Sequence, residues 1–487
     1  MVWTSEGSPI SFLWDCVTIA TDGQSVGASS DGVLSFVQPF QNVKLRDDNE
    51  DIAPGNGGGN LSLVPLTAPL RSPAFYGNYT VQYPHNVTGE TAEISMANQL
   101  TALRNWKIHA MNTAESAHSM DFIKKGGSAT PDGNGDYGAS YAKTLWELEQ
   151  VNNILRSQNQ SHGVAAILFV HGEADATSST YKAKMLQYWE DKNTDIKAIT
   201  GQKRDIIILL SQQHSCPPNI NVRALSAQHC HELATEYPDK FIAFPKYQYV
   251  YKDETPYYYG LHLTHQSQRR LGQQAAHILD RCYSGLTHSL SPTSASIVGN
   301  VITVNFSVPV PPLQWSATLP AVHGAIAQWV NGKGFEVEDN SGKITINSVA
   351  IVGNSVVITC NTTPGAGKRL SYAMYQDIDG QFYGGLAAGR HGLLCDSDPF
   401  VGISDESFIC TMTNGYNVAT AQYTGIFRNR GPREFIVSSG VNLGTYITAL
   451  SNESATMSMP WAGQSSNFLL RFQNDHRNYC RAFTMLL

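Results

Sequence analysis

A serine stands between two glycines in the segment Gly23-Gln-Ser25-Val-Gly27, directly after the apolar run Val17-Thr-Ile-Ala. An apolar, β-branched run predicts a buried strand. Glycines on both sides allow a tight turn because they have no Cβ to clash at positive φ. Such a turn lifts a serine hydroxyl off the end of a sheet, where a base can reach it. Ser25 is the predicted nucleophile of a hydrolase; the alternative is an ordinary strand-to-loop turn with a solvated serine.

Hydrolysis through a serine needs a base, an acid that orients the base, and donors for the oxyanion. His262 is the predicted base, since it lies behind an aromatic loop and just before a predicted helix. Glu173 follows the apolar run Val164–Val170, at the sheet edge where Ser25 is also expected. The alternatives are a histidine with a purely structural role and a glutamate that braces its loop through backbone amides.

Strands alternate with helices as far as residue 285, which predicts a parallel sheet with helices on both faces. The predicted strands after the first are Trp106–Met111, Val164–Val170, Asp205–Ser211 and Phe241–Phe244. The predicted helices are Thr91–Asn105, Tyr141–Arg156, Thr180–Trp189, Val222–Tyr237 and Arg270–Cys282. In such sheets ligands bind at the carboxyl ends of the strands, and Ser25, His171 and Glu173 all follow predicted strands. Residues 28–90 are interpreted as a long irregular wall beside the site.

The pattern changes after residue 285. Residues 284–296 have the composition of a linker, and alternating β runs with Gly-Asn pairs at 299–300 and 353–354 then predict hairpins. We expect a lead-in over 1–15, an α/β domain over 16–285, a β-sandwich over 297–400 and a β-rich module over 401–487 for carbohydrate binding or assembly.

The composition narrows the class of protein. The chain has 487 residues, 42% hydrophobic and 15% charged, which predicts two to four globular domains. A net charge of −7 without a basic run argues against nucleic acid as a partner. The N-terminus shows neither a signal peptide nor an apolar span, so no membrane insertion is expected. The eight cysteines lack C-x-x-C spacing and are expected to be buried thiols. Neighbours such as His229, Cys230 and His231 do not share one helix face, so neither a metal nor a cofactor is expected.

Three blocks in order resemble the SGNH hydrolases, and within them the carbohydrate esterases of the sialate O-acetylesterase type. Gly23-Gln-Ser25 resembles the nucleophile motif of that family. His171-Gly-Glu173-Ala-Asp175 resembles its Q-G-E-S-D block, and Gly260-Leu-His262-Leu-Thr resembles its D-G-x-H-L-T block. The resemblance covers residues 15 to 285. Val37-Gln-Pro-Phe40 and Gly89-Glu-Thr-Ala are similar to the esterase domains of phage tail proteins.

The resemblance implies an SGNH-type, flavodoxin-like three-layer fold, followed by C-terminal β-sandwich modules. It implies a catalytic set of Ser25, His262 and Glu173. The oxyanion would be held by backbone N–H groups of Ser25, Ser116 and Ala117 and by the His171 side chain.

Three departures from the family pattern affect the site. Tyr259 stands where the family has an aspartate, and a phenol with a pKa of about 10 cannot supply the orienting carboxylate. Glu173 is the expected replacement, because in some carbohydrate esterases this glutamate partners the histidine; Asp175 and Asp253 are the alternative acids. His171 replaces a Gln or Asn donor, and residues 113–117 lack the family's glycines.

The expected function is a serine esterase that removes O-acetyl groups from a carbohydrate or polysaccharide, such as a cell-surface glycan. The alternative, motivated by Tyr259, is a non-catalytic glycan-binding protein that keeps a hydrolase fold. A lipid esterase of the same superfamily is a third hypothesis, disfavoured because no amphipathic lid-like segment is evident. The resemblance to phage tail proteins implies a virion-associated or extracellular protein that assembles as a homotrimer.

Overall fold

The structure is a computed structural model with a mixed α/β architecture. It describes residues 14–28, 35, 38–47, 60–68, 70, 90–127, 139–213, 224–249, 251–252, 262–319, 322, 327–374, 391–403, 408–411, 422–429, 453–458, 469–472 and 476–487.

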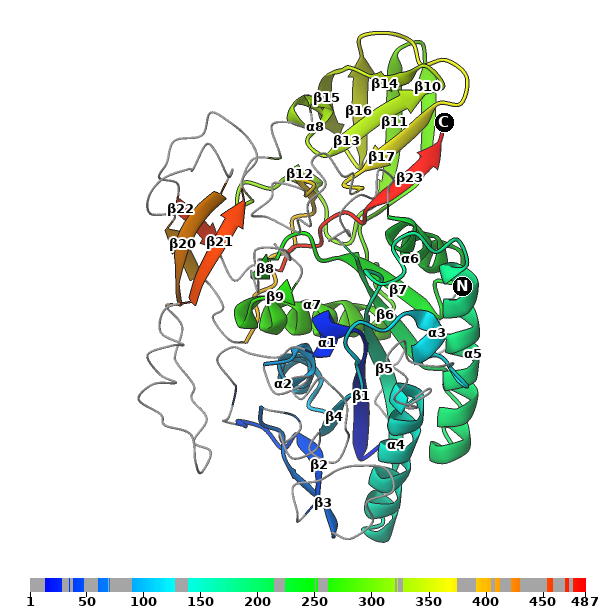
Figure 1. Ribbon diagram of the computed structural model, residues 1–487, viewed down its shortest axis with the longest axis vertical. Coiled ribbons are helices and arrows are strands. Elements are labelled where there is room, and N and C mark those ends of the chain that lie inside the picture. The colour runs from blue at the N-terminus through cyan, green and yellow to red at the C-terminus, as the bar shows by residue number, and fades with distance from the viewer. Residues whose placement is uncertain are drawn as a thin grey trace.

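A seven-stranded sheet forms the centre of the N-terminal part (Figure 1). Its strands are β1 Cys16–Gly23, β2 Val43–Asp47, β3 Leu61–Pro65, β4 Ile108–Asn112, β5 His162–Val170, β6 Ile207–Gln212 and β7 Phe241–Pro245. Their spatial order is β3-β2-β4-β1-β5-β6-β7, and every pairing is parallel except β2 with β3. Five strands, β1 and β4–β7, are buried at every residue. That burial explains their continuous apolar runs, because both faces of the sheet are covered.

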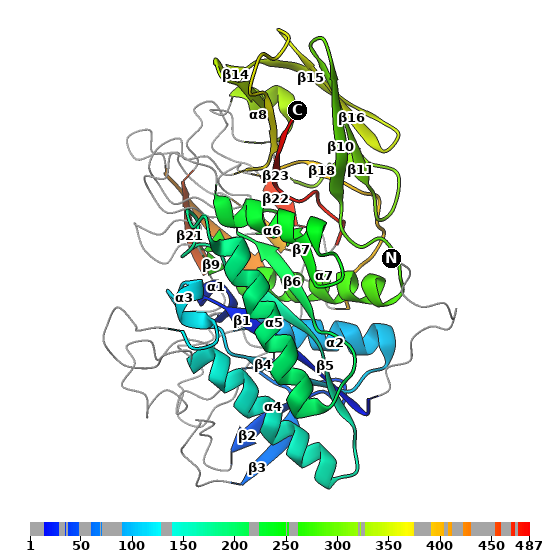
Figure 2. The same cartoon turned by 90° about the vertical axis from the view of Figure 1, so that its right-hand side faces the viewer.

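Helices cover the sheet on both faces. The helices of the described N-terminal part are α1 Ser25–Ala28, α2 Ala92–Arg104, α3 Met120–Ile123, α4 Ala139–Ser157, α5 Tyr181–Thr200, α6 Leu225–Glu236 and α7 His265–Tyr283. A further helix, α8 Ala327–Gly332, lies in the C-terminal part. Figure 1 shows α2 and α7 on one side of the sheet and α4 and α5 on the other. In Figure 2 the molecule is turned so that α4 and α5 lie toward the viewer. Two separate apolar cores follow, one under α2 and α7 and one under α3–α6. The predicted three-layer arrangement of sheet and helices is confirmed in this coarse form.

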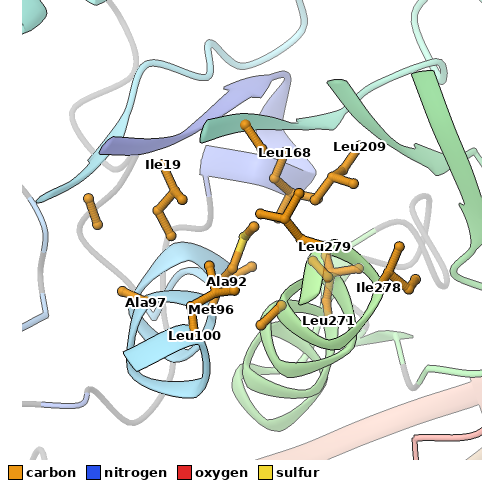
Figure 3. Packing of buried hydrophobic residues seen from close by; sticks show 14 of the residues in the cluster. Ile19, Ala92, Met96, Ala97, Leu100, Leu168, Leu209, Leu271, Ile278 and Leu279 are labelled. Atoms are coloured by element: carbon orange, nitrogen blue, oxygen red, sulfur yellow. The ribbon is translucent and has the colours of Figure 1, made fainter. Parts of the chain in front are cut away.

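The core under α2 and α7 determines how closely these helices approach (Figure 3). Ile19 and Leu168 from the sheet lie over Met96 of α2 and Leu279 of α7. A Cβ on Gly272 would lie 2.0 Å from the carbonyl oxygen of Ala92, so only glycine permits this contact. The close approach fixes α7, which begins three residues after His262.

Two helices are longer than the sequence pattern predicts. α5 continues beyond Trp189 because its buried stripe goes on through Ile196, and it ends at Gly201, whose φ of 76° caps the helix in the left-handed region. α7 begins at His265 rather than at Arg270, because the side chain of Thr264 caps it by accepting a hydrogen bond from the N–H of Ser267.

The prediction of an irregular wall over residues 28–90 is wrong in part. Residues 43–65 contain the antiparallel pair β2–β3, which extends the sheet beyond β4. These strands are short, and β3 is only partly buried, so they lack the apolar run that marks the central strands. Residues 29–34, 48–59 and 71–89 lie outside the described residues.

Antiparallel sheets make up the C-terminal part. The first comprises β10 Ser291–Val298, β11 Val301–Ser307, β15 Ile346–Val352 and β16 Ser355–Cys360. The second comprises β13 Phe335–Asp339, β14 Gly342–Ile344, β17 Arg369–Tyr372 and β23 Phe483–Leu486. A third comprises β19 Phe408–Thr411, β20 Gln422–Asn429, β21 Glu453–Ser458 and β22 Leu469–Phe472; β12 Gln314–Trp315 pairs with β18 Leu394–Cys395. The predicted hairpins at the two Gly-Asn pairs are confirmed, with φ of 60° at Gly299 and Gly353.

The last strand of the chain, β23, belongs to this sandwich. β23 pairs with β17, and Phe483 lies in the same apolar core as β10–β18. The carboxamide of Gln212, at the end of β6, exchanges two hydrogen bonds of 2.9 Å with the backbone of Ala482. The last residues therefore bridge the sandwich and the α/β sheet, while the predicted domain boundaries, including that at residue 400, stay predictions.

Two general features complete the fold. None of the helices that the structure describes has the length and apolar character needed to span a bilayer. The six cysteines whose side chains are described are buried and are not joined in disulfides.

Candidate active site

The turn after β1 positions Ser25 at the carboxyl edge of the sheet, where the strand order reverses between β4 and β5. Gly23 has φ of 131°, and a Cβ there would lie 2.2 Å from the carbonyl oxygen of Val170. Only glycine tolerates both conditions. Gly27 differs from the prediction, since it lies inside α1 without a positive φ; its lack of a side chain instead allows close packing, because a Cβ would lie 3.2 Å from that of Val170.

Asp22, the residue before Gly23, stabilises this turn through buried hydrogen bonds. Its carboxylate accepts hydrogen bonds from the N–H of Gly23 at 2.8 Å, from the hydroxyl of Ser140 at 2.7 Å and from the hydroxyl of Tyr188. The ammonium of Lys192 lies 3.5 Å away, and all these side chains are buried. The sequence reasoning missed Asp22, although a charged residue at the end of an apolar strand was an available signal.

His262 and Ser25 meet in the structure. Nε2 of His262 lies 2.9 Å from Oγ of Ser25, which is hydrogen-bond distance, and both side chains are half-buried. His262 belongs to β9 His262–Leu263, which pairs with β8 Tyr251–Lys252, and Thr264 then caps α7. This geometry allows the imidazole to accept the hydroxyl proton of the serine.

Glu173 has a cationic partner at the same edge of the sheet. Its Oε1 accepts a hydrogen bond of 2.6 Å from Nζ of Lys246, which follows β7, and the pair is almost fully buried. The N–H of the next residue, Ala174, donates to the carboxamide of Gln24 at 3.2 Å. This contact ties the Glu173 loop to the residue before Ser25. The predicted role of Glu173 as the acid that orients His262 stays a prediction.

Of the two alternative acids, Asp175 and Asp253, the structure describes only Asp175. Asp175 caps α3, because its Oδ2 accepts a hydrogen bond of 2.7 Å from the N–H of Met120. A buried carboxylate engaged with a helix terminus is bracing the structure, so Asp175 is a weaker candidate than its place in the motif indicates. Asp253 lies outside the described residues, as does Tyr259.

The structure does not support the predicted role of His171 as a side-chain oxyanion donor. Nε2 donates to the carbonyl oxygen of His118 at 2.9 Å, and Nδ1 lies 3.2 Å from the hydroxyl of Tyr181. Burial lowers the pKa of His171, which favours the neutral ring. A neutral imidazole has a single N–H, and here that N–H already has its acceptor. His171 instead anchors the loop of residues 113–118.

That loop runs alongside the nucleophile turn. The N–H groups of Thr113 and Glu115 donate to the carbonyl oxygens of Thr21 and Gly23 at 2.9 and 3.0 Å. Ala117 is exposed and has φ of 61°, a left-handed conformation that a glycine would adopt without strain. Ser116 and Ala117 therefore stay candidates for backbone oxyanion donors. We call residues 113–118 the oxyanion loop.

Glu90, from the quoted Gly89-Glu-Thr-Ala block, fixes α7 from another direction. Its buried carboxylate accepts a hydrogen bond of 3.2 Å from Nε of Arg269 and one of 2.7 Å from the N–H of Ser35.

Within the described part of the chain, no group of three or more histidine, cysteine or acidic residues could hold a metal ion.

Comparisons with known proteins give similarity at the level of structure only. No family model matches the chain, and no curated protein matches it. Solved structures similar to it include a carbohydrate acetylesterase from Xanthomonas citri, with 13% identity and a TM-score of 0.48, covering 75% of this chain and 77% of that one. A protein from Arabidopsis thaliana has 13% identity and a TM-score of 0.36, covering 56% of this chain and 98% of that one.

A third similar structure is NanS, with 14% identity and a TM-score of 0.33, covering 56% of this chain and 97% of that one. At these identities and TM-scores, the similarities establish neither a shared fold nor a shared activity.

Proposed function

We propose that this protein is a serine esterase that removes acyl groups, O-acetyl above all, from a carbohydrate or polysaccharide. The observation that carries the proposal is the 2.9 Å contact between Oγ of Ser25 and Nε2 of His262. A half-buried serine on a glycine-dependent turn, within hydrogen-bond distance of a histidine, is the arrangement that acyl transfer requires.

In the proposed reaction, Oγ of Ser25 attacks the ester carbonyl carbon while Nε2 of His262 takes the hydroxyl proton. Backbone N–H groups of Ser25 and of the oxyanion loop stabilise the tetrahedral oxyanion. The intermediate then expels the sugar oxygen, which receives the proton from His262. Water, deprotonated by the same nitrogen, then attacks the acyl-enzyme; the bond between Oγ and the acyl carbon breaks, acetate leaves, and Oγ of Ser25 takes the proton back from His262. Glu173 orients His262 in this scheme, and Lys246 holds Glu173.

The choice of an acetylated glycan rests on the resemblance of the three sequence blocks to carbohydrate esterases. An association with a phage tail, an extracellular or virion location and a homotrimeric assembly rest on that resemblance alone. We include them in the proposal as expectations for the intact protein.

A non-catalytic glycan-binding protein is the second candidate function. It is favoured by the substitution at Tyr259 and by the engagement of Glu173 with Lys246. Losing an orienting aspartate costs about 10⁴-fold in kcat where nothing replaces it. Such a protein would bind glycan equally well with Ser25 or with alanine at that position.

The test compares wild type with Ser25→Ala on p-nitrophenyl acetate and on acetylated glycans. We expect kcat to fall by about 10⁶-fold, because removal of a serine nucleophile leaves only binding and oxyanion stabilisation. Ser157→Ala, at an exposed serine near the end of α4, is the matched control and should be unaffected.

A serine-reactive phosphonate should label Ser25 in wild type. Two results would contradict the esterase: labelling of a different residue, or a wild type that is inert on every ester. Glycan binding by such an inert wild type, unchanged in Ser25→Ala, would support the binding protein instead.

A further inference from the structure

The single turn α1 is too short for its last backbone carbonyls to find partners within the helix itself. Two of these carbonyls are bonded by side-chain amides from distant parts of the chain. The carboxamide of Gln268 donates to Val26 at 2.7 Å, and that of Asn112 donates to Gly27 at 2.9 Å. Both amide side chains are buried. The residues directly after Ser25 are thus held from two sides.

Asn112 links α1 to the oxyanion loop. It is the last residue of β4, and its Oδ1 accepts a hydrogen bond of 3.0 Å from the N–H of Ala114. One carboxamide therefore donates to the nucleophile turn and accepts from the oxyanion loop. The Glu93 carboxylate lies 3.3–3.4 Å from the same amide nitrogen and provides a second acceptor, which holds the amide in this orientation.

Gln268 links α1 to the base. It lies in the first turn of α7, six residues after His262 and four after the cap residue Thr264. The backbone N–H of Gln268 donates to the carbonyl oxygen of Thr264 at 2.9 Å, so the side chain and the start of the helix are fixed together. A displacement of α7 relative to α1 would change the distance from His262 to Ser25.

We propose that Asn112 and Gln268 are positioning residues that clamp the nucleophile turn between the oxyanion loop and the histidine. Asn112 fixes where the oxyanion donors stand relative to Ser25, and Gln268 fixes where His262 stands relative to it. This inference rests on the proposed function, since positioning has meaning only if Ser25 is the nucleophile.

The expected effect is on rate rather than on binding. A misplacement of about 1 Å in a catalytic constellation costs about 10²-fold in rate. Groups that act only in the transition state lower kcat and leave KM unchanged. Asn112→Ala and Gln268→Met should therefore each lower kcat for p-nitrophenyl acetate by about 10²-fold with little change in KM. The rate at which a phosphonate labels Ser25 should fall in parallel.

A double variant tests whether the two amides act on one element. Because both hold α1, their effects should be coupled, as expected for residues that share a partner. The combined loss in kcat should be smaller than the product of the two single losses.

The matched control is Asn152→Ala. Asn152 is also a buried asparagine whose amide donates to a backbone carbonyl, that of Ile199 at 3.0 Å, but it joins α4 to α5 away from Ser25. The Asn152→Ala variant should lose as much free energy of unfolding as Asn112→Ala, while its kcat stays at the wild-type value. Urea unfolding curves for all variants establish the conditions under which each is fully folded.

If Asn112→Ala does not fold, Asn112→Leu takes its place, because leucine fills nearly the same volume and removes the amide without setting a second carboxylate beside Glu93. Folded variants at Asn112 and Gln268 with wild-type kcat would overturn the clamp, as would an equal loss in Asn152→Ala. A Ser25→Ala variant that kept its activity would instead overturn the proposed function, so the two failures are distinguishable.

Discussion

On the β4 side of the nucleophile turn, the contacts are made by uncharged amides and backbone groups, whereas on the β5–β7 side the loop beside the turn is held by a buried ion pair. The first side consists of Asn112 and the oxyanion loop, bonded to Gly27, Thr21 and Gly23. The second consists of Glu173 and Lys246, 2.6 Å apart and both buried.

The two sides differ in how much free energy of unfolding a substitution should remove. A neutral hydrogen bond contributes about 0.5–1.5 kcal/mol, so its loss leaves most of the free energy of unfolding intact. Removal of one partner of a buried ion pair leaves an uncompensated charge and costs about 3–5 kcal/mol. We therefore expect substitutions on the β4 side to lower kcat with only a small loss in the free energy of unfolding. Substitutions of one charged residue on the β5–β7 side should mainly lower the free energy of unfolding.

The largest expected effect on stability comes from Lys246→Met. It should lower the free energy of unfolding by about 3–5 kcal/mol, because the carboxylate of Glu173 stays buried without its cation. Urea unfolding at neutral pH measures the loss. Lys182→Met is the control, since Lys182 forms only partly exposed ion pairs with Glu232 and Glu236 and should cost about 1 kcal/mol or less.

The double variant Glu173→Gln with Lys246→Met sharpens the comparison. Replacement of both charges removes the buried charge altogether and should recover most of the stability, since buried pairs exchanged for uncharged residues are often neutral. If Glu173 orients His262, kcat stays low in this stable double variant. Recovery of kcat together with stability would show that Glu173 only braces its loop.

A smaller and pH-dependent effect is expected at Glu93, behind the β4 side. Burial raises the pKa of Glu93 from 4.5 to about 7, although hydrogen bonds from Thr91 and Asn112 oppose the shift. Between pH 4.5 and about 7, Glu93 is therefore protonated in the folded state and ionised in the unfolded state. The stability from this proton is fully present below pH 4.5 and is lost as the pH rises through about 7.

Wild type should therefore lose about 3 kcal/mol relative to Glu93→Gln across that interval, at 1.36 kcal/mol per pKa unit. Unfolding free energies of both proteins at several pH values give the difference directly. Glu147→Gln, at another buried glutamate, controls for general effects of pH. A difference between wild type and Glu93→Gln that does not change with pH would contradict the raised pKa.

The sheet and the turn at Ser25 were predictable from the sequence because their signals are local, whereas His262 was singled out mainly by the resemblance of its sequence block to a known family. Continuous apolar runs mark strands covered on both faces, and the polar residues that follow them meet at one edge. β2 and β3 were not predictable in this way, because short, partly buried strands leave no such run. Equally, the pairing of β23 with β17 joins segments more than a hundred residues apart.

The supporting residues of the site depend on contacts that no local pattern records. Gln268 stands among several polar residues at the start of α7, and only the packing of α7 on α1 selects it. Lys246 pairs with a residue on another strand end. For His171 the motif pointed to a donor into the site, but Tyr181 and the carbonyl of His118 determine where its single N–H points.

The smallest expected effect lies on the β4 side, at Ala117. Its φ of 61° places an L-residue in the left-handed region, which costs about 1–2 kcal/mol. Glycine avoids this cost but loses about 0.5–1 kcal/mol in backbone entropy. Ala117→Gly should therefore raise the free energy of unfolding by about 0.5–1 kcal/mol, measured by urea unfolding. Ala114→Gly, in the same loop without a positive φ, should lower it. Destabilisation by both substitutions would mean that Ala117 is not strained, and that the hydrogen bonds to the oxyanion loop determine its turn without a cost at this residue.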